Sequence, residues 1–247
     1  MRALLAFFTV LPISTADSSL DDAARRVYLL PLVGLLTGLP GALILLLAFV
    51  VPPGVAATLA LGTVLIAAGL HHTDGVMDVG AALMVRGDPA RRREVMKDAR
   101  VGVGAMWALF LVYAPSVAAL VALAQASPAK AAVSLLAAET AARSAMLLVL
   151  LFGEPAEKGS SSLLFVRSLR EGRARAGALV LAFLFPLLVA TPLRWAGISA
   201  LLAAPMTALF TLTLARRVFG GISGDVAGAT GEAARTVLLV ALSGLLL

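Results

Sequence analysis

The sequence has no cysteine, few charged residues and few aromatic ones. The absence of cysteine among its 247 residues excludes disulfides, thiolate catalysis and cysteine-bound zinc or iron–sulfur clusters. Only 14% of the residues are charged, whereas a soluble domain has about 25%. Aromatic residues make up 6%, and no basic stretch is interleaved with stacking aromatics. Nucleic-acid binding is therefore not expected, despite the net charge of +6.

Long apolar runs make up most of the chain. Hydrophobic residues account for 60% of it, and the mean hydropathy is +0.99. Several runs approach the ~20 residues that a helix needs to cross a hydrocarbon core, and they are too continuous for barrel strands. The sequence predicts one all-α domain over residues 1–247, a polytopic integral membrane helical bundle with six or seven transmembrane helices. The predicted spans are 29–51, 55–76, 102–124, 130–152, 177–193, 197–215 and 235–247.

The first residues, "MRALLAFFTVLPISTADSS", have the order of charge, apolar run and small residues that a signal peptide has. The apolar stretch Ala3–Ile13 is too short to span a bilayer, and a multispanning protein can be inserted through its first long helix. We therefore expect a short interfacial or re-entrant segment there, with a cleaved signal peptide as the alternative.

Lysine and arginine are distributed unevenly between the two sides of the predicted bundle. If the N-terminus is cytoplasmic, seventeen of the twenty fall on that side, and only Lys130 and Arg194 fall on the other. This positive-inside pattern predicts a plasma-membrane protein whose N-terminus and polar segments 81–101, 153–176 and 216–235 face the cytoplasm. Within the first of these, the stretch 89–100 is expected to form a short amphipathic helix with proline in its first turn.

The stretch "GLHHTDGVMDVG", residues 69–80, carries the most distinctive acidic residues. Asp74, Asp78 and position 81 are spaced so that they share one helix face. Two neighbouring carboxylates at the end of a membrane segment need compensation, which a hard cation such as Mg²⁺ supplies. A proton relay and structural pairing are the alternatives. His71 falls on the Asp74 face and His72 does not, and for either one an interfacial hydrogen-bonding role competes with ligation.

The stretch "FGGISGDVAGATGE", residues 219–232, is a second candidate for the same site. It places Asp225 in glycine-rich backbone, which can turn several N–H groups toward a phosphate. Gly221, Ser223 and Gly224 are its candidate substrate-binding residues. A third carboxylate from another helix would suit a one- or two-metal clamp on a phosphoryl group, with Asp74, Asp78 and Asp225 as ligands.

Several cations are candidates for neutralising an anionic substrate. The stretch "EVMKDARVGVG", residues 94–104, contains Lys97, Asp98 and Arg100, and Arg86 lies in the same polar segment. Arg143 is predicted to form a buried ion pair with Glu139 inside a span, with a substrate-phosphate role as the alternative.

In combination, these motifs resemble the adenosylcobinamide-GDP ribazoletransferase (cobalamin synthase) family. The resemblance rests on "LHHTDGVMDVG", "VMKDARVGVG", "GGISGD" and the early "FFTVLP" before "LLPLVGLLTG", in order across about residues 5–235. The compact "RGDPARRREVMKD" stretch is similar to the archaeal branch. The resemblance implies Mg²⁺-dependent transfer of adenosylcobinamide phosphate from adenosylcobinamide-GDP to α-ribazole or α-ribazole 5′-phosphate, with release of GMP. It places His72 on the substrate side of the site.

The chain departs from the family pattern at two positions. Ala81 stands where the pattern has a third aspartate, so a catalytic or metal-binding carboxylate is missing. The chain is either a divergent member or, as we prefer, one in which aspartate was replaced by alanine, which predicts substrate binding with poor turnover. Val10 stands where many relatives have arginine, which weakens a phosphate role for the N-terminal segment.

Three other functions compete with this one. A CDP-alcohol phosphotransferase-like enzyme would have a fuller array of aspartates after the first motif. A prenyltransferase-like enzyme would have a second aspartate-rich motif, whereas Asp225 has no close carboxylate neighbour in the sequence. An ion or proton transporter would have mid-membrane charges and an internal repeat, and no repeat is visible. The sequence leaves monomer and homo-oligomer open.

Overall fold

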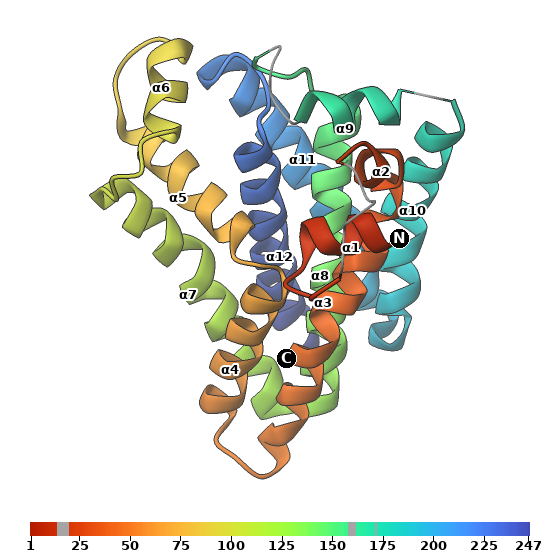
Figure 1. Ribbon diagram of the computed structural model, residues 1–247. Helices are drawn as coiled ribbons and strands as arrows, with labels where there is room; N and C mark the ends of the chain where they lie inside the picture. Colours follow the sequence, from red (N-terminus) through yellow and green to blue (C-terminus); the bar gives the residue numbers. More distant parts are fainter. Residues whose placement is uncertain (14–19, 158–161, 171) are drawn as a thin grey trace.

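The protein is a bundle of helices packed around a central one, α8 (Figure 1). The computed structural model describes residues 1–13, 20–157, 162–170 and 172–247, and every regular element within these ranges is helical. The helices of 14 or more residues are α3 (Leu30–Leu45), α4 (Pro53–Ala67), α5 (His71–Met84), α7 (Val103–Ala126), α8 (Pro128–Phe152), α10 (Gly172–Ala190), α11 (Ser199–Val218) and α12 (Gly224–Leu246). The shorter segments are α1 (Arg2–Phe8), α2 (Leu20–Arg25), α6 (Pro89–Met96), α9 (Ser162–Leu169) and the 3-10 turns η1 (Val27–Leu29), η2 (Leu46–Phe49) and η3 (Thr191–Ile198). The predicted all-α fold is confirmed.

The number of membrane spans agrees with the lower end of the prediction. Within the described ranges, five helical stretches are long and apolar enough to cross a membrane, or six if α4 and α5 form one bent span. The five are Val27–Phe49, Val103–Ala126, Pro128–Phe152, Gly172–Ile198 and Gly224–Leu246. The predicted span 197–215 corresponds to α11, which is not among them. Large apolar side chains such as Phe110 and Phe210 face outward, as suits contact with lipid tails.

Helix α8 is the core of the bundle because small residues let its neighbours approach closely. Of its most apolar 18-residue window, 83% is buried. At Gly34 of α3, a Cβ atom would lie 2.5 Å from the carbonyl oxygen of Glu139, and at Gly38 it would lie 2.9 Å from Glu139 Cγ. Glycine and alanine at such contacts are typical of membrane helices, whose association depends on close packing.

The predicted span 55–76 is not one continuous helix, because the chain bends by 94° between α4 and α5. At the bend Gly69 and Leu70 both have left-handed backbone, with φ of +79° and +59°. Such a conformation is easy for glycine and uncommon for leucine, so an unbroken apolar run does not show it. The bend places the acidic motif on a helix of its own, beside α7 and α12 (Figure 1).

The predicted boundary at residue 235 is also wrong. Helix α12 begins at Gly224 and continues for 23 residues, so more than half of the predicted polar segment 216–235 belongs to it. Glu232 and Arg235 lie inside this helix and are fully buried, and Arg235 is therefore not a cytoplasmic surface charge. Their opposite charges pair within the bundle, which lowers the cost of placing both in an apolar helix.

The short polar helix predicted at 89–100 is present as α6, and it ends earlier, at Met96. Asp88 caps it by accepting a hydrogen bond of 2.9 Å from the backbone N–H of Arg91. Residues 81–84, predicted as loop, form the last turn of α5. At the N-terminus α1 is shorter than the predicted segment Ala3–Ile13, and its Leu4 and Phe8 are buried against the bundle.

Candidate active site

Glycine contacts bring the acidic motif of α5 against the start of α12. At Gly75 a Cβ atom would lie 2.7 Å from the carbonyl oxygen of Asp225, and at Gly228 it would lie 3.0 Å from His72 Cδ2. On the other side, a Cβ atom at Gly80 would lie 2.8 Å from the carbonyl oxygen of Gly104 in α7. The two acidic stretches, more than 140 positions apart in the sequence, therefore meet in space.

Three carboxylates share this meeting point. Asp74 is exposed, and Asp78 and Asp225 are half-buried. Both Asp74 and Asp225 lie close enough to Asp78 to repel it electrostatically. Ser223 donates a hydrogen bond of 3.3 Å to Asp225 Oδ2, whereas within the described ranges Asp74 and Asp78 have no side-chain hydrogen bond or ion pair. Neighbouring anions without partners favour a bound cation.

The three carboxylates are near one another without surrounding a single point. Among the residues that the structure describes, no three His, Asp or Glu side chains are gathered closely enough to hold a metal ion. One or two carboxylates at a time could ligate a cation, with other oxygens completing its shell. Magnesium binds in this way in proteins, because it keeps several waters and uses substrate phosphates.

The packing at Gly75 gives a test of how closely α5 and α12 must meet. We expect Gly75→Ala to lower stability by about 1–3 kcal/mol, because its new methyl group overlaps the Asp225 carbonyl oxygen. Gly62→Ala in α4 is the matched control, since a Cβ atom there has nothing within 4 Å. Thermal unfolding in detergent measures both variants. A melting temperature that falls equally in the two would contradict this contact.

The glycine-rich stretch before α12 binds other backbone rather than opening toward a ligand. The N–H of Gly221 donates to Ala215 O over 3.2 Å, and that of Ile222 donates to Glu154 O over 2.8 Å. Gly221 has φ of +154°, and a Cβ atom on it would lie 2.6 Å from Glu154 O. Ser223 caps α12 by accepting from the N–H of Val226. The exposed Gly224, at the first position of α12, is left facing the site.

Most cations of the polar segment 81–101 form ion pairs with nearby carboxylates. Lys97 Nζ lies 2.8 Å from Glu157 Oε2, and Arg100 Nη2 lies 2.6 Å from Asp98 Oδ2. The hydrogen bond from Arg100 lowers the pKa of Asp98 to about 2, and the one from Lys97 lowers the pKa of Glu157. Arg86 is exposed after α5. Within the described ranges, none of these side chains forms a hydrogen bond or an ion pair with the carboxylate of Asp74 or Asp78.

Ala81 lines a cavity of about 550 Å³ between α5 and the start of α7. Arg100, Gly104 and Trp107 form other parts of its wall. The position lies on the Asp74 and Asp78 face of α5, as the spacing predicts. A longer side chain at this position has open space in front of it.

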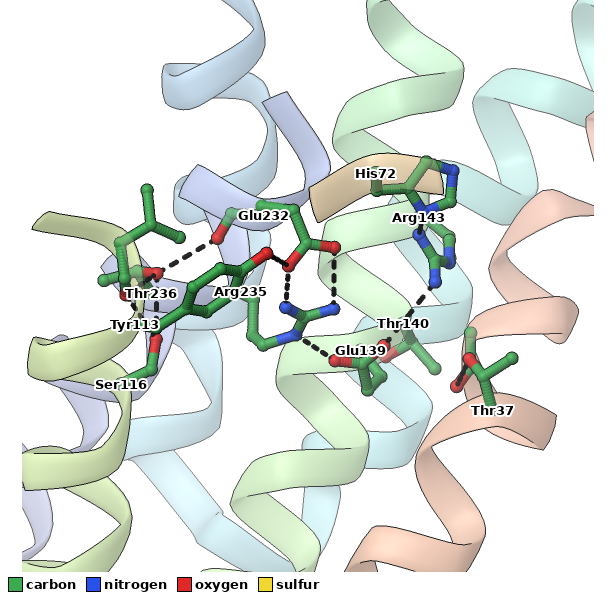
Figure 2. A network of polar contacts seen from close by, with 12 residues as sticks. Thr37, His72, Tyr113, Ser116, Glu139, Thr140, Arg143, Glu232, Arg235 and Thr236 are labelled. Atoms are coloured by element: carbon green, nitrogen blue, oxygen red, sulfur yellow. Dashed lines mark hydrogen bonds and ion pairs between the residues drawn. The ribbon is translucent and has the colours of Figure 1, made fainter. Parts of the chain in front are cut away.

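A buried network of charged side chains lies beneath the site (Figure 2). Arg235 forms ion pairs with both Glu139 and Glu232, and all three side chains are fully buried. Arg143 Nη2 lies 4.0 Å from Glu139 Oε2, so the predicted Arg143–Glu139 pair exists as the looser of two pairs at that glutamate. The ion pair of Glu232 with Arg235 was not predicted. Their spacing of three residues, just before an apolar run, is nevertheless typical of an ion pair within one helix.

The network also holds the first turn of α5. Arg143 Nη1 donates to His72 Nδ1 over 2.6 Å. The Tyr113 hydroxyl lies 2.9 Å from Thr73 Oγ1 and 3.0 Å from Glu232 Oε2. His72 points away from the Asp74 face, as the sequence predicts, and it packs against Arg143. The residues immediately before Asp74 are thus tied to α7, α8 and α12.

Comparison with known proteins assigns the chain to a family. The family model described as "Cobalamin-5-phosphate synthase" matches residues 1–243. The chain belongs to the cobalamin-5-phosphate synthase family. Curated relatives named adenosylcobinamide-GDP ribazoletransferase, from Methanocella arvoryzae and Halorubrum lacusprofundi, are each 34% identical over 97% of the chain and 93–94% of the relative. No solved structure matches.

A relative of the same name from Azorhizobium caulinodans is also 34% identical, over 96% of the chain and 92% of the relative. This identity equals that of the relatives from Methanocella arvoryzae and Halorubrum lacusprofundi. The identities therefore do not distinguish one branch of the family from another, and membership of the archaeal branch stays a prediction. Two of the stretches that carry the resemblance lie on α5 and at the start of α12, and they meet where Gly75 packs against Asp225.

Proposed function

We propose that the protein transfers the adenosylcobinamide-phosphate moiety of adenosylcobinamide-GDP to α-ribazole or α-ribazole 5′-phosphate, with release of GMP and with Mg²⁺. The family match and the printed name of the relatives support the reaction. The observation that carries the site is the meeting of α5 and α12, which gathers Asp74, Asp78 and Asp225. The buried charges of α8 and α12 are ones that a transporter would also have, but they pair with one another, and the family match favours the transferase.

The proposed reaction is a phosphoryl transfer that needs positioning and charge neutralisation more than a covalent nucleophile. A ribazole hydroxyl oxygen forms a bond to the phosphorus next to the cobinamide arm. The bond from that phosphorus to the bridging oxygen breaks, and GMP leaves with the electron pair. One of the unpaired carboxylates, Asp74 or Asp78, accepts the hydroxyl proton.

The donor set of the site fits Mg²⁺. Carboxylate oxygens are the ligands that this ion prefers, and in the described part of the chain Asp74, Asp78 and Asp225 form no ion pair with a basic side chain. When bound, Mg²⁺ would offset the negative charge on the pyrophosphate. The N–H at the first position of α12 lies at the same end, where the helix dipole favours an anion.

The site is placed on the cytoplasmic face of the plasma membrane in this proposal. Helix α6 and the end of α11, which carries Arg216 and Arg217, lie at the end of the bundle where α12 begins (Figure 1). A concentration of arginine on one face supports the positive-inside orientation.

The direct test combines purified protein with adenosylcobinamide-GDP, α-ribazole and Mg²⁺, and follows GMP and the corrinoid product by chromatography. We expect equal amounts of both products, and none after chelation of the metal. Formation of no GMP, by this chain and by its Ala81→Asp variant, would overturn the proposed function.

Ala81→Asp is expected to raise kcat at least about tenfold, because it returns a carboxylate to the face that carries Asp74 and Asp78. The cavity beside position 81 provides the space. Ala81→Asn is the control, since it has the same shape without the charge, and it should give no such gain. Equal kcat values for the native chain and Ala81→Asp would contradict the assignment of a missing carboxylate.

A further inference from the structure

A second cavity, of about 500 Å³, lies beside the carboxylates and has aromatic walls. It is formed by α1, the first turn of α5, the last turns of α8, α9 and the start of α12. Its wall includes Phe7 and Phe8 from α1 and Phe165 from α9. Asp225 is part of the wall too, so the cavity and the carboxylate site share one residue.

The aromatic rings form a continuous cluster on this wall. The ring centroids of Phe7 and Phe8 are 4.8 Å apart, and those of Phe7 and Phe165 are 5.4 Å apart. The His72 ring is inclined by 29° to that of Phe8, at 6.1 Å. Phe8, Phe165 and His72 are buried, whereas the Phe7 side chain is 43% exposed at the mouth. The buried Arg143 holds His72 from behind, which fixes its ring.

We propose that this cavity binds the flat bicyclic base of the ribazole acceptor, an inference that rests on the proposed function. A volume of about 500 Å³ is within the range of small-ligand pockets, about 300–1,000 Å³. A nucleoside fits this range and a corrinoid does not. Aromatic side chains bind bases through their π faces. Asp225 lines the same cavity, so the sugar of a base held here would lie beside the site of the proposed transfer.

The wall of the cavity is mainly apolar, which suits this base better than guanine, and its polar members are His71, His72, Ser162 and Asp225. Met146, Leu150, Ala6 and Ala227 complete much of the surface around the rings. A benzimidazole-type base has only two ring nitrogens and an apolar second ring. Guanine has hydrogen-bonding groups along two edges, and each one left unpaired in a buried site costs free energy. The α1 stretch "FFTVLP", part of the family resemblance, thereby acquires a role in binding the acceptor.

Steady-state kinetics of Phe7→Ala test the proposal, with each substrate varied in turn. We expect the KM for α-ribazole to rise at least about fivefold, the size of a lost stacking contact, while the KM for adenosylcobinamide-GDP stays within about twofold. Phe7→Tyr keeps the ring and should restore the native KM. Phe49→Ala is the matched control, because Phe49, the last residue of η2, is 69% exposed and does not line the cavity.

Calorimetric titration of the purified protein with α-ribazole, without corrinoid, separates this proposal from the function. We expect binding that is weakened by Phe7→Ala and unaffected by GMP. If the native chain makes product but Phe7→Ala raises only the KM for adenosylcobinamide-GDP, or neither KM, the assignment of the cavity is overturned and the function stands. Binding of α-ribazole without turnover, by this chain and by its Ala81→Asp variant, would support the cavity and count against the function.

Discussion

Asp78→Asn is expected to lower kcat by about 100-fold or more, while the protein keeps its fold. Asp78 is the middle member of the three carboxylates, close to both Asp74 and Asp225. Loss of one positioned proton acceptor or electrostatic group from an active site has an effect of this size. Because its side chain has no hydrogen-bond or ion-pair partner within the described ranges, the amide should leave packing unchanged. Product formation under saturating substrates measures the effect.

The matched control for this variant is Glu94→Gln, which removes one negative charge from the exposed surface of α6. We expect it to keep kcat within about twofold, since surface substitutions of this kind are usually close to neutral. Electron paramagnetic resonance of bound Mn²⁺ provides a second readout, and Asp78→Asn should weaken binding while Glu94→Gln should not. Native turnover by Asp78→Asn would remove this residue from the site.

Arg235→Met is expected to destabilise the bundle by about 3–5 kcal/mol, enough to prevent recovery of folded protein. Arg235 pairs with Glu139 and Glu232, and all three side chains are completely buried. Methionine fills a similar volume, so the cost arises from two glutamates left without their partner in an apolar interior. The folded fraction after gel filtration and the melting temperature in detergent measure the effect.

Arg217→Met is the matched control for Arg235→Met, because Arg217 is exposed in the last turn of α11. Its stability should change by no more than about 0.5 kcal/mol. The network also holds Thr73 and His72, through Tyr113 and Arg143, so partial unfolding of Arg235→Met should appear first at the start of α5. Equal melting temperatures for the two variants would show that the buried pairs contribute nothing to stability.

Much of the architecture could be predicted from local properties of the sequence. Composition and run length predicted a helical membrane protein, and the short helix α6 followed from the proline in its first turn. The bend after α4 could not be predicted in this way. Leu70 has left-handed backbone that its residue type disfavours, so contacts elsewhere in the bundle must select it.

The candidate site was predictable in part, because the common helix face of Asp74 and Asp78 follows from their spacing in the sequence. Their proximity to Asp225 depends on Gly75, whose missing side chain lets α12 approach. Gly221 was expected to bind phosphate, but its N–H donates to Ala215 O at the end of α11. The backbone N–H groups of a glycine-rich stretch can donate either to a phosphate or to a neighbouring backbone carbonyl. Only the fold decides which of the two they bind.

By itself, the sequence determined the membrane-helical class and the placement of Asp74 and Asp78 one turn apart on one helix, and it predicted a sidedness from lysine and arginine. These are properties of composition and of spacing within one helix, so they need no knowledge of neighbours. The tertiary structure alone decided the bend before α5, the burial of Glu232 with Arg235, and the aromatic cavity beside Asp225. Each of these depends on contacts between residues far apart in the chain, which local patterns do not encode.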